Sequence, residues 1–246
     1  VKVTDKSIVA TTYETDSLKV VDQVEIEKST ADTTNENVQR ISGVDREQTA
    51  IEVSKKMFKD GTNKVVLANK NNYSDVLTAA PFAKANNASL LYISSNSISK
   101  EVMSEIARLK AKEITIIGGE KSVNEGLKKE LEKRNFKVER LSGADRYKTS
   151  AQIAAKLIDD KTTTLEIASG ENYADALSLN NAAEKDKAPI LLVRVNAIDK
   201  SVEDVIKSSK ASLINIAGGE KSVSENTKAN IKKISKATVN RMGGAD

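Results

Sequence analysis

The sequence predicts an α/β protein built from two tandem modules, plus a short N-terminal β segment. Three observations predict this: motifs recur at an offset of 100 residues, helical and strand-like segments alternate within each copy, and the strand-like segments are continuously apolar. Continuous apolar runs indicate parallel strands covered on both faces. Each module is therefore expected to have three layers, with a mainly parallel sheet of about four strands covered by helices, in a Rossmann-like or toprim-like arrangement.

Three motif pairs define the copies. RISGVDR, NYSDVL and GGEKSV, at residues 40, 72 and 118, return as RLSGADR, NYADAL and GGEKSV at residues 140, 172 and 218. RMGGAD, from residue 241, opens like a third copy that the chain carries only in part. We expect an N-terminal β-rich segment and linker at 1–36, a first repeat at 37–138, a second repeat at 139–238 and a truncated start of a third at 239–246.

In the first copy, apolar side chains at Val53, Met57 and Phe58 mark one face of a helix. The elements expected after it are a strand at 64–69, a helix at 73–86, a strand at 89–94, a helix at 101–110, a strand at 113–119, a helix at 122–134 and a strand from 137.

The second copy repeats this order. Its first helix carries Ile153, Leu157 and Ile158 at the same spacing, and strands are expected at 165–169 and 189–193.

The first 36 residues follow a different pattern. The segments 7–15 and 18–27 flank Asp16 and Ser17 and predict either a β-hairpin or the tail of a β domain. The polar stretch 29–37 is typical of a linker.

The composition excludes several kinds of chemistry. The chain has no cysteine and no histidine, so it lacks thiol nucleophiles, disulfides and the commonest general base and metal ligand. We expect no catalytic residue, no metal and no cofactor. No run is apolar enough to span a membrane, and the residues lack a nucleic-acid-binding pattern.

The charge is uneven along the chain. The net charge is +4, but residues 1–36 carry four lysines against eight acidic residues, which leaves +8 on the remainder. A basic body attracts anionic partners if its lysines cluster, and is otherwise a solvated surface.

The GGEKS turn has two interpretations. The glycines Gly118, Gly119, Gly218 and Gly219 could form a tight turn, followed by a Ser-x-x-Glu capping box at residues 122 and 125, and 222 and 225. Alternatively, the amides at the helix start could contact an anion, together with the adjacent lysines. Those lysines are Lys121 and Lys221.

The SGxDR motif also stands where a strand ends and a helix begins. Gly43 and Gly143 supply the turn, and Asp45 and Asp145 are candidate helix caps. An arginine in the first turn of a helix faces the positive end of the helix dipole, so it requires a partner. For these arginines, the partner is either an internal carboxylate or an acidic ligand. They are Arg46 and Arg146.

The NYxDxL motif begins a helix, with Asn72 as a candidate cap and Asp75 in the first turn. Tyr73 and Tyr173 could stack on a sugar ring or pack in the core. All three motifs lie at strand-to-helix turns, the sheet edge at which α/β proteins usually bind ligands.

Several of these motifs, in fixed order, resemble the type 2 cell wall-binding repeat of clostridial S-layer and cell wall proteins. They are SGxDRYxT at 142–149, NYADALS at 172–178, PILLV at 189–193 and GGxxSVS at 218–224, and the resemblance covers residues 37–246. It implies a secreted protein of the Gram-positive cell wall or S-layer, anchored non-covalently to an anionic wall polysaccharide. It also implies three tandem modules with pseudo-threefold packing, and S-layer proteins as further partners.

The resemblance points to the arginine, aspartate and tyrosine positions named above and to the run Ile190–Leu192, which is more typical of a buried strand. The first copy departs from the pattern, with Leu90-Leu91-Tyr92 in place of ILL and VDREQT in place of ADRYKT, and the second has Asn181 where the pattern has proline. The first module is therefore expected to bind more weakly or to be structural. Two other hypotheses remain open: an α/β enzyme that uses a nucleotide or sugar phosphate, and a pure S-layer scaffold module.

Overall fold

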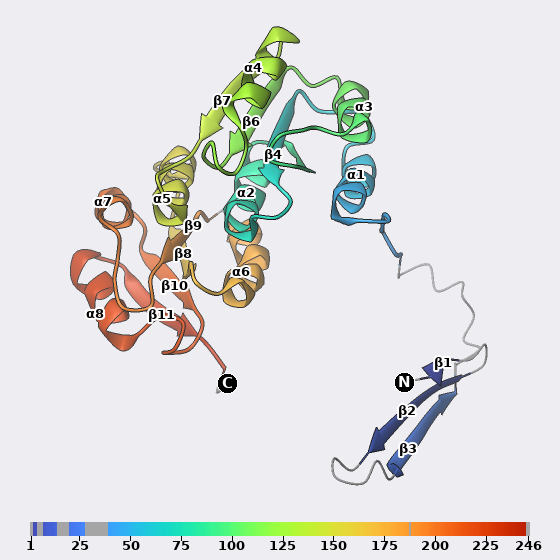
Figure 1. The fold of residues 1–246 in the computed structure, drawn as a ribbon. Helices are drawn as coiled ribbons and strands as arrows, with labels where there is room; N and C mark the ends of the chain where they lie inside the picture. The colour runs from blue at the N-terminus through green and yellow to red at the C-terminus, as the bar shows by residue number, and fades with distance from the viewer. Residues whose placement is uncertain (1, 4–6, 14–19, 28–38, 187, 245–246) are drawn as a thin grey trace. The chain divides into compact units, whose positions relative to one another are not determined.

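The computed structural model describes residues 2–3, 7–13, 20–27, 39–186 and 188–244. They belong to two units, residues 1–40 and 41–246 (Figure 1). The N-terminal unit is an antiparallel sheet with the order β1-β2-β3, formed by β1 (Lys2–Val3), β2 (Ser7–Tyr13) and β3 (Val20–Glu27). Pairing of β2 with β3 confirms the expected hairpin. Its turn and the expected linker at 29–37 lie outside the described residues.

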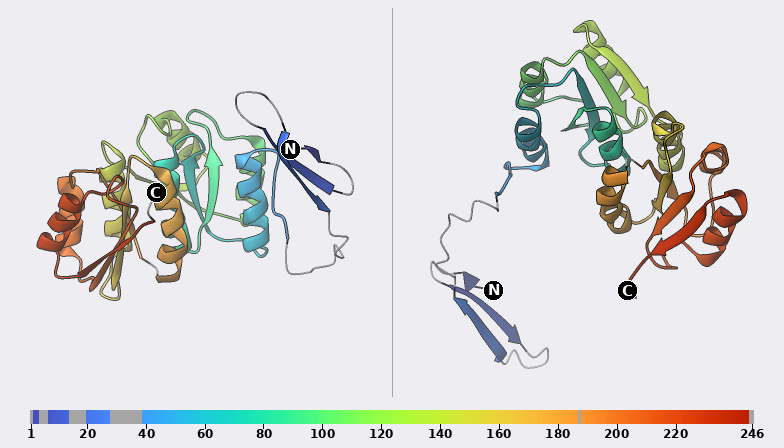
Figure 2. Two further views of the ribbon diagram at one scale, coloured as in Figure 1. Left: turned by 90° about the horizontal axis from the view of Figure 1, so that it is seen from below. Right: turned by 180° about the vertical axis from the view of Figure 1, so that it is seen from behind.

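The larger unit contains two four-stranded parallel sheets with flanking helices, which confirms the predicted fold class (Figures 1 and 2). The first copy comprises α1 (Arg46–Met57), β4 (Lys64–Asn69), α2 (Tyr73–Ala85), β5 (Ser89–Ile93), α3 (Lys100–Leu109), β6 (Glu113–Ile117), α4 (Glu125–Lys133) and β7 (Lys137–Leu141). The second comprises α5 (Arg146–Leu157), β8 (Thr164–Ser169), α6 (Tyr173–Asp186), β9 (Ile190–Val193), α7 (Lys200–Ser208), β10 (Leu213–Ala217), α8 (Glu225–Ile234) and β11 (Thr238–Met242).

Both sheets have the same strand order, β5-β4-β6-β7 and β9-β8-β10-β11. In each, the order reverses between the first and third strands of the copy, and ligands of open α/β sheets bind beyond the carboxyl ends of the strands at such a point. The expected repeat boundaries at 138/139 and 238/239 fall inside β7 and β11, and each of these strands completes the sheet of its own copy.

The core explains the continuous apolar strands. Along β4, Val65 and Leu67 pack into a cluster with α3 and α4, whereas Val66 and Ala68 pack against α2. Because successive side chains of a strand point to opposite faces, a strand between two helical layers has apolar side chains on both faces.

The two copies interlock through their helices. Leu77 of α2 belongs to the core cluster of the second copy, and Ile153 of α5 belongs to a core cluster of the first. Helix α2 packs against both α5 and α6, as Figure 1 shows. The apolar stripe predicted on the first helix of each copy is therefore better covered in the second. Ile153 is buried and Leu157 half-buried there, whereas their counterparts Val53 and Met57 are 37% and 58% exposed.

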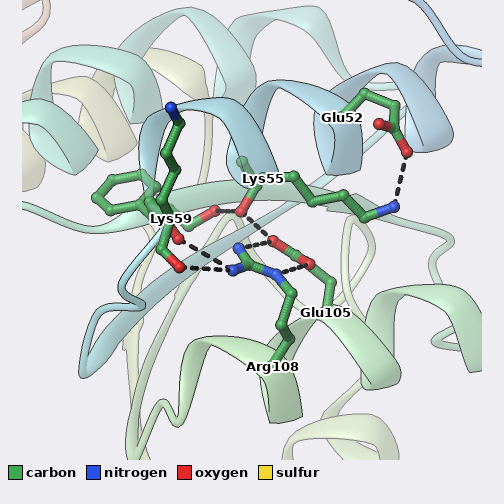
Figure 3. A network of polar contacts seen from close by, with 8 residues as sticks. Glu52, Lys55, Lys59, Glu105 and Arg108 are labelled. Carbon is green, nitrogen blue, oxygen red and sulfur yellow. Dashed lines mark hydrogen bonds and ion pairs between the residues drawn. The ribbon is translucent and has the colours of Figure 1, made fainter.

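A polar cluster joins α1 to α3 in the first copy (Figure 3). The buried carboxylate of Glu105 accepts bonds of 2.7 and 2.8 Å from Nε and Nη2 of Arg108 and one of 2.5 Å from the hydroxyl of Ser54. Arg108 also donates a 3.0 Å bond to the carbonyl of Phe58, just after α1. The second copy has Val205 and Ser208 at the positions of Glu105 and Arg108, so the cluster is specific to the first.

Candidate functional site

A groove of about 630 Å³ lies where the two copies meet, at the carboxyl-end edge of the first sheet. It is lined from the first copy by Asn72, Ser74, Asp75, Gly119, Glu120, Lys121 and Ser122, and from the second by Gly143, Ala144, Asp145, Arg146 and Thr149. The three motifs singled out in the sequence thus supply both walls: NYxDxL and GGEKS come from one copy and SGxDR from the next.

Asp75 forms the floor of this groove. Its side chain is buried, and Oδ2 accepts bonds of 2.7 Å from both the Ser122 hydroxyl and the Asn72 amide. Burial raises the pKa of Asp75, although the bond from Ser122 and the charge of Arg146 act to lower it. Gly118 has φ +108°, and a Cβ there would collide with the Asp75 carboxylate, so glycine is required for this close approach.

The expected Ser-x-x-Glu capping boxes are wrong. Helix α4 begins at Glu125 and is capped by Asn124, whose oxygen accepts a 2.6 Å bond from the Gly126 amide. In the second copy, Ser224 is the cap of α8. Ser122 is not free to cap a helix because its hydroxyl is committed to Asp75, which lies 47 residues earlier in the chain.

The expected aspartate caps of the SGxDR motif are confirmed. Oδ1 of Asp45 accepts a 2.8 Å bond from the Gln48 amide, and Oδ1 of Asp145 accepts a 2.9 Å bond from the Lys148 amide. Gly143 lies so close to Lys148 that a Cβ would collide with it. The turn therefore fixes the position at which the following arginine leaves the helix.

The arginines of this motif bond to backbone carbonyls and form no ion pair with a described carboxylate. Of the two partners that the sequence left open, the internal carboxylate is therefore not found, and the acidic ligand stays a prediction. Nη1 of Arg46 donates a 2.6 Å bond to the carbonyl of Lys70, and Nη1 of Arg146 donates to the carbonyl of Gly170 at the equivalent position. Each bond ties the start of a copy's first helix to the loop after its first strand.

Arg146 also reaches across the boundary between the copies. Nη1 donates a 3.1 Å bond to the hydroxyl of Tyr73, and the guanidinium lies 5.7 Å from the centre of that ring. The rings of Tyr73 and Tyr173 are 5.5 Å apart between centres, and they are 40% and 56% exposed. These tyrosines therefore form an exposed aromatic cluster between the copies and do not belong to the core.

The other expected site residues do not line this groove. Asp45 and Arg46 stand exposed at the start of α1, and Lys221 is exposed on the second copy's own turn. There the carboxylate of Asp175 lies against Gly218 as Asp75 lies against Gly118, but its Oδ2 has no hydrogen-bond partner among the described residues. The run Ile190–Leu192 is buried in β9, as expected for a core strand.

Sequence reasoning missed two arginines that hold the GGEKS turns. Arg140 donates a 2.8 Å bond to the carbonyl of Gly118 and lies 3.2 Å from Glu125. Arg241 makes the same pair of contacts with Gly218 and Glu225, at 2.7 and 3.0 Å. The signal was present, because an arginine precedes each SG or GG turn at residues 140 and 241.

The described residues contain no cluster of three or more acidic side chains arranged to hold a metal ion. Among the helices in that part of the chain, none has the length and apolar character needed to cross a membrane.

Fold and site together define a tandem-repeat α/β protein whose candidate site is shared between successive repeats. The family model for cell wall binding domain 2 (CWB2) matches residues 40–128 and 140–228, and the chain belongs to this family. The matched segments fall on the two structural copies.

Three known proteins illustrate the relationship. Cwp8 from Clostridium difficile aligns with a TM-score of 0.77 and 36% identity, over 84% of this chain and 35% of that one. Cwp6 from the same organism aligns with a TM-score of 0.78 and 28% identity, over 97% and 37%. N-acetylmuramoyl-L-alanine amidase LytC of Bacillus subtilis is 31% identical over 188 residues, which are 76% of this chain and 37% of that protein.

This chain thus spans roughly a third of the length of these relatives. Family membership and the two structural neighbours indicate that this chain binds the cell wall and belongs to a cell wall-associated surface protein. The similarity to the amidase is partial.

Proposed function

We propose that the chain anchors a secreted Gram-positive surface or S-layer protein non-covalently by binding an anionic secondary polysaccharide of the cell wall. The observation that carries this proposal is the convergence of motif residues from both copies on one groove. Lys121, Asp145 and Arg146 line it, and the exposed ring of Tyr73 stands beside Arg146, with the ring of Tyr173 next to it.

The chemistry of these residues suits a charged glycan. Exposed tyrosines offer apolar faces on which sugar rings stack, and arginine and backbone amides at helix starts donate to oxygen acceptors. The charge of +8 outside the first 36 residues raises the local concentration of a polyanion around the repeats. No metal or cofactor enters this proposal.

A third repeat is the partner that we propose for the exposed faces of the larger unit. Leu77 of α2 packs into the second copy beside α5, but its counterpart Leu177 on α6 is 57% exposed. A groove of about 400 Å³ between α1 and α2, lined by Val53, Met57 and Leu90 among others, lies in the first copy where α2 packs in the second. A third copy packed by the same contacts would cover both surfaces.

The test is sedimentation of the chain with purified cell walls, before and after chemical removal of their anionic polymer. We expect the chain to pellet with intact walls, to remain in solution with stripped walls, and to be released by salt because a polyanion is involved. Equal pelleting on both preparations would refute binding to the polymer. Adding a complete third repeat is expected to raise the melting temperature and to protect Met57 from oxidation.

A further inference from the structure

The groove between the copies contains more negative than positive charge. Its carboxylates are those of Asp75, Glu120 and Asp145, and its cations are Lys121 and Arg146. Even when Arg194, 3.9 Å from Asp145 but outside the groove, is included, the charges only balance. A phosphate or carboxylate group entering the groove would have no surplus cation to pair with, and it would lose hydration on entry.

The guanidinium of Arg146 is already partly used in hydrogen bonds within the protein. One of its terminal nitrogens donates to the carbonyl of Gly170 and to the hydroxyl of Tyr73, and its charge faces the buried Asp75. A bidentate grip on an external anion by both terminal nitrogens would require these contacts to break. Lys121 is then the main cation of the groove open to a ligand, and Glu120 is its immediate neighbour in the chain.

The carboxylates of the groove, one on each wall, suit hydroxyl groups. A carboxylate accepts hydrogen bonds through four lone-pair sites, and hydroxyls are donors that carry no charge to repel it. Glu120 is exposed. Oδ1 of the half-buried Asp145 caps α5, and its Oδ2 has, among the described residues, only the loose contact with Arg194. Tyr73, which is hydrogen-bonded to Arg146, adds an aromatic face for the ring that bears the hydroxyls.

The unpaired positive charge lies elsewhere. On α8, Lys232 and Lys233 are exposed and form no ion pair with any described residue. An anionic group of a long polymer can therefore be attracted by such lysines while a different part of the same polymer occupies the groove.

We propose that the groove between the copies binds an uncharged, hydroxyl-bearing sugar unit, through the carboxylates of Glu120 and Asp145, and that the anionic groups of the polymer remain outside it. This inference rests on the proposed function and specifies which chemical part of the ligand the shared site recognises. Charge then determines how strongly the polymer is attracted, and the sugar unit determines which polymer is held.

The test measures binding of the chain, by calorimetry, to neutral oligosaccharides released from purified wall polymer by hydrofluoric acid. We expect binding that changes less than about twofold between roughly 0.05 and 0.5 M salt, because a contact without net charge is not screened. Glu120→Gln is expected to weaken it about tenfold, the value of a hydrogen bond to a charged group. The matched change in the second copy, Glu220→Gln, and the double change Lys232→Gln/Lys233→Gln are expected to leave it unaltered.

An increase in affinity on Glu120→Gln, in place of the expected loss, would overturn the inference. If the groove holds an anion, removing the charge of Glu120 strengthens binding of the intact polymer, and the neutral oligosaccharides fail to bind. No change with Glu120→Gln, or an equal loss with the α8 lysine variant, would also overturn it. Failure of the intact polymer to bind would instead refute the proposed function. If the chain bound only the neutral sugars of stripped peptidoglycan, the groove would still recognise hydroxyl groups, but the sugar would come from peptidoglycan and not from the anionic polymer.

Discussion

Arg146 of the second copy donates a 3.1 Å hydrogen bond to the hydroxyl of Tyr73 in the first, so one contact couples the two repeats beside the candidate site. Replacing Arg146 by alanine removes this bond and the bond to the carbonyl of Gly170. We expect Arg146→Ala to weaken adsorption to cell walls about tenfold and to lower the free energy of unfolding by about 1–2 kcal/mol. Sedimentation with walls and urea denaturation check the two effects.

The control for that change is Arg134→Ala. Arg134 is exposed at the end of α4, pairs with Glu130 at 2.7 Å and does not line the groove. An exposed pair of this kind contributes little to stability, so both adsorption and unfolding should be nearly unchanged. Equal losses in the two variants would indicate that adsorption depends on total positive charge and not on the boundary between the copies.

The serine that supports Asp75 provides a second prediction. Ser122→Ala leaves a buried carboxylate oxygen with Asn72 as its remaining donor among the described residues, and we expect a loss of about 1–3 kcal/mol of stability. Ser222→Ala is the matched variant, because the second copy shows no bond from Ser222 to Asp175. The melting temperature of Ser122→Ala should be clearly lower than that of Ser222→Ala. Equal melting temperatures would contradict the role given to Ser122.

The interlocking of the copies can be tested with two equivalent leucines. Leu77 is 5% exposed within the core of the second copy, whereas Leu177 is 57% exposed. Leu77→Ala should cost about 2–4 kcal/mol, as buried leucines usually do, and Leu177→Ala less than about 0.5 kcal/mol. If denaturant unfolding gives similar values for both, α2 does not pack between α5 and α6 in solution.

The cluster of Glu105, Arg108 and Ser54 predicts a pH dependence of stability. Burial disfavours ionisation of Glu105, but the hydrogen bonds from Arg108 and Ser54 outweigh it and lower the pKa of Glu105 below its ordinary value. Because the pKa of Glu105 is lower in the folded state, ionised Glu105 contributes its full stabilisation of the fold above the unfolded-state pKa of about 4.5. This contribution is lost as the pH falls through the folded-state pKa.

Glu105→Gln should therefore lower the free energy of unfolding by about 2 kcal/mol at neutral pH. The difference in this free energy between variant and wild type should shrink below a pH of about 4. Melting curves recorded from neutral to acidic pH measure this difference. A difference that stays constant over the whole range would show that the charge of Glu105 does not stabilise the fold.

The sequence predicted the elements well where local patterns decide them. The strand at 64–69 has the expected bounds, because a short, continuous apolar run between turn residues is typical of a buried strand. The caps at Asp45 and Asp145 were also predictable, since an aspartate before a helix bonds to the amide three residues later.

The site was predictable only in part. Repetition singled out the motifs, but Ser122 was assigned to a helix cap because its partner Asp75 is distant in the sequence, and no local rule pairs them. The meeting of Tyr73 with Arg146 depends on the packing of α2 against α5 and α6, which is a property of the assembled copies. Whether these residues bind a ligand stays a prediction.

The most direct measurement of the central claim is the amide ¹H–¹⁵N spectrum of the chain during titration with purified wall polymer. If the polymer occupies the groove between the copies, the signals of Gly119, Lys121 and Gly143 shift together and saturate, while that of Gly61, in the turn after α1, stays in place. A saturable titration that leaves the groove amides unmoved would contradict the account.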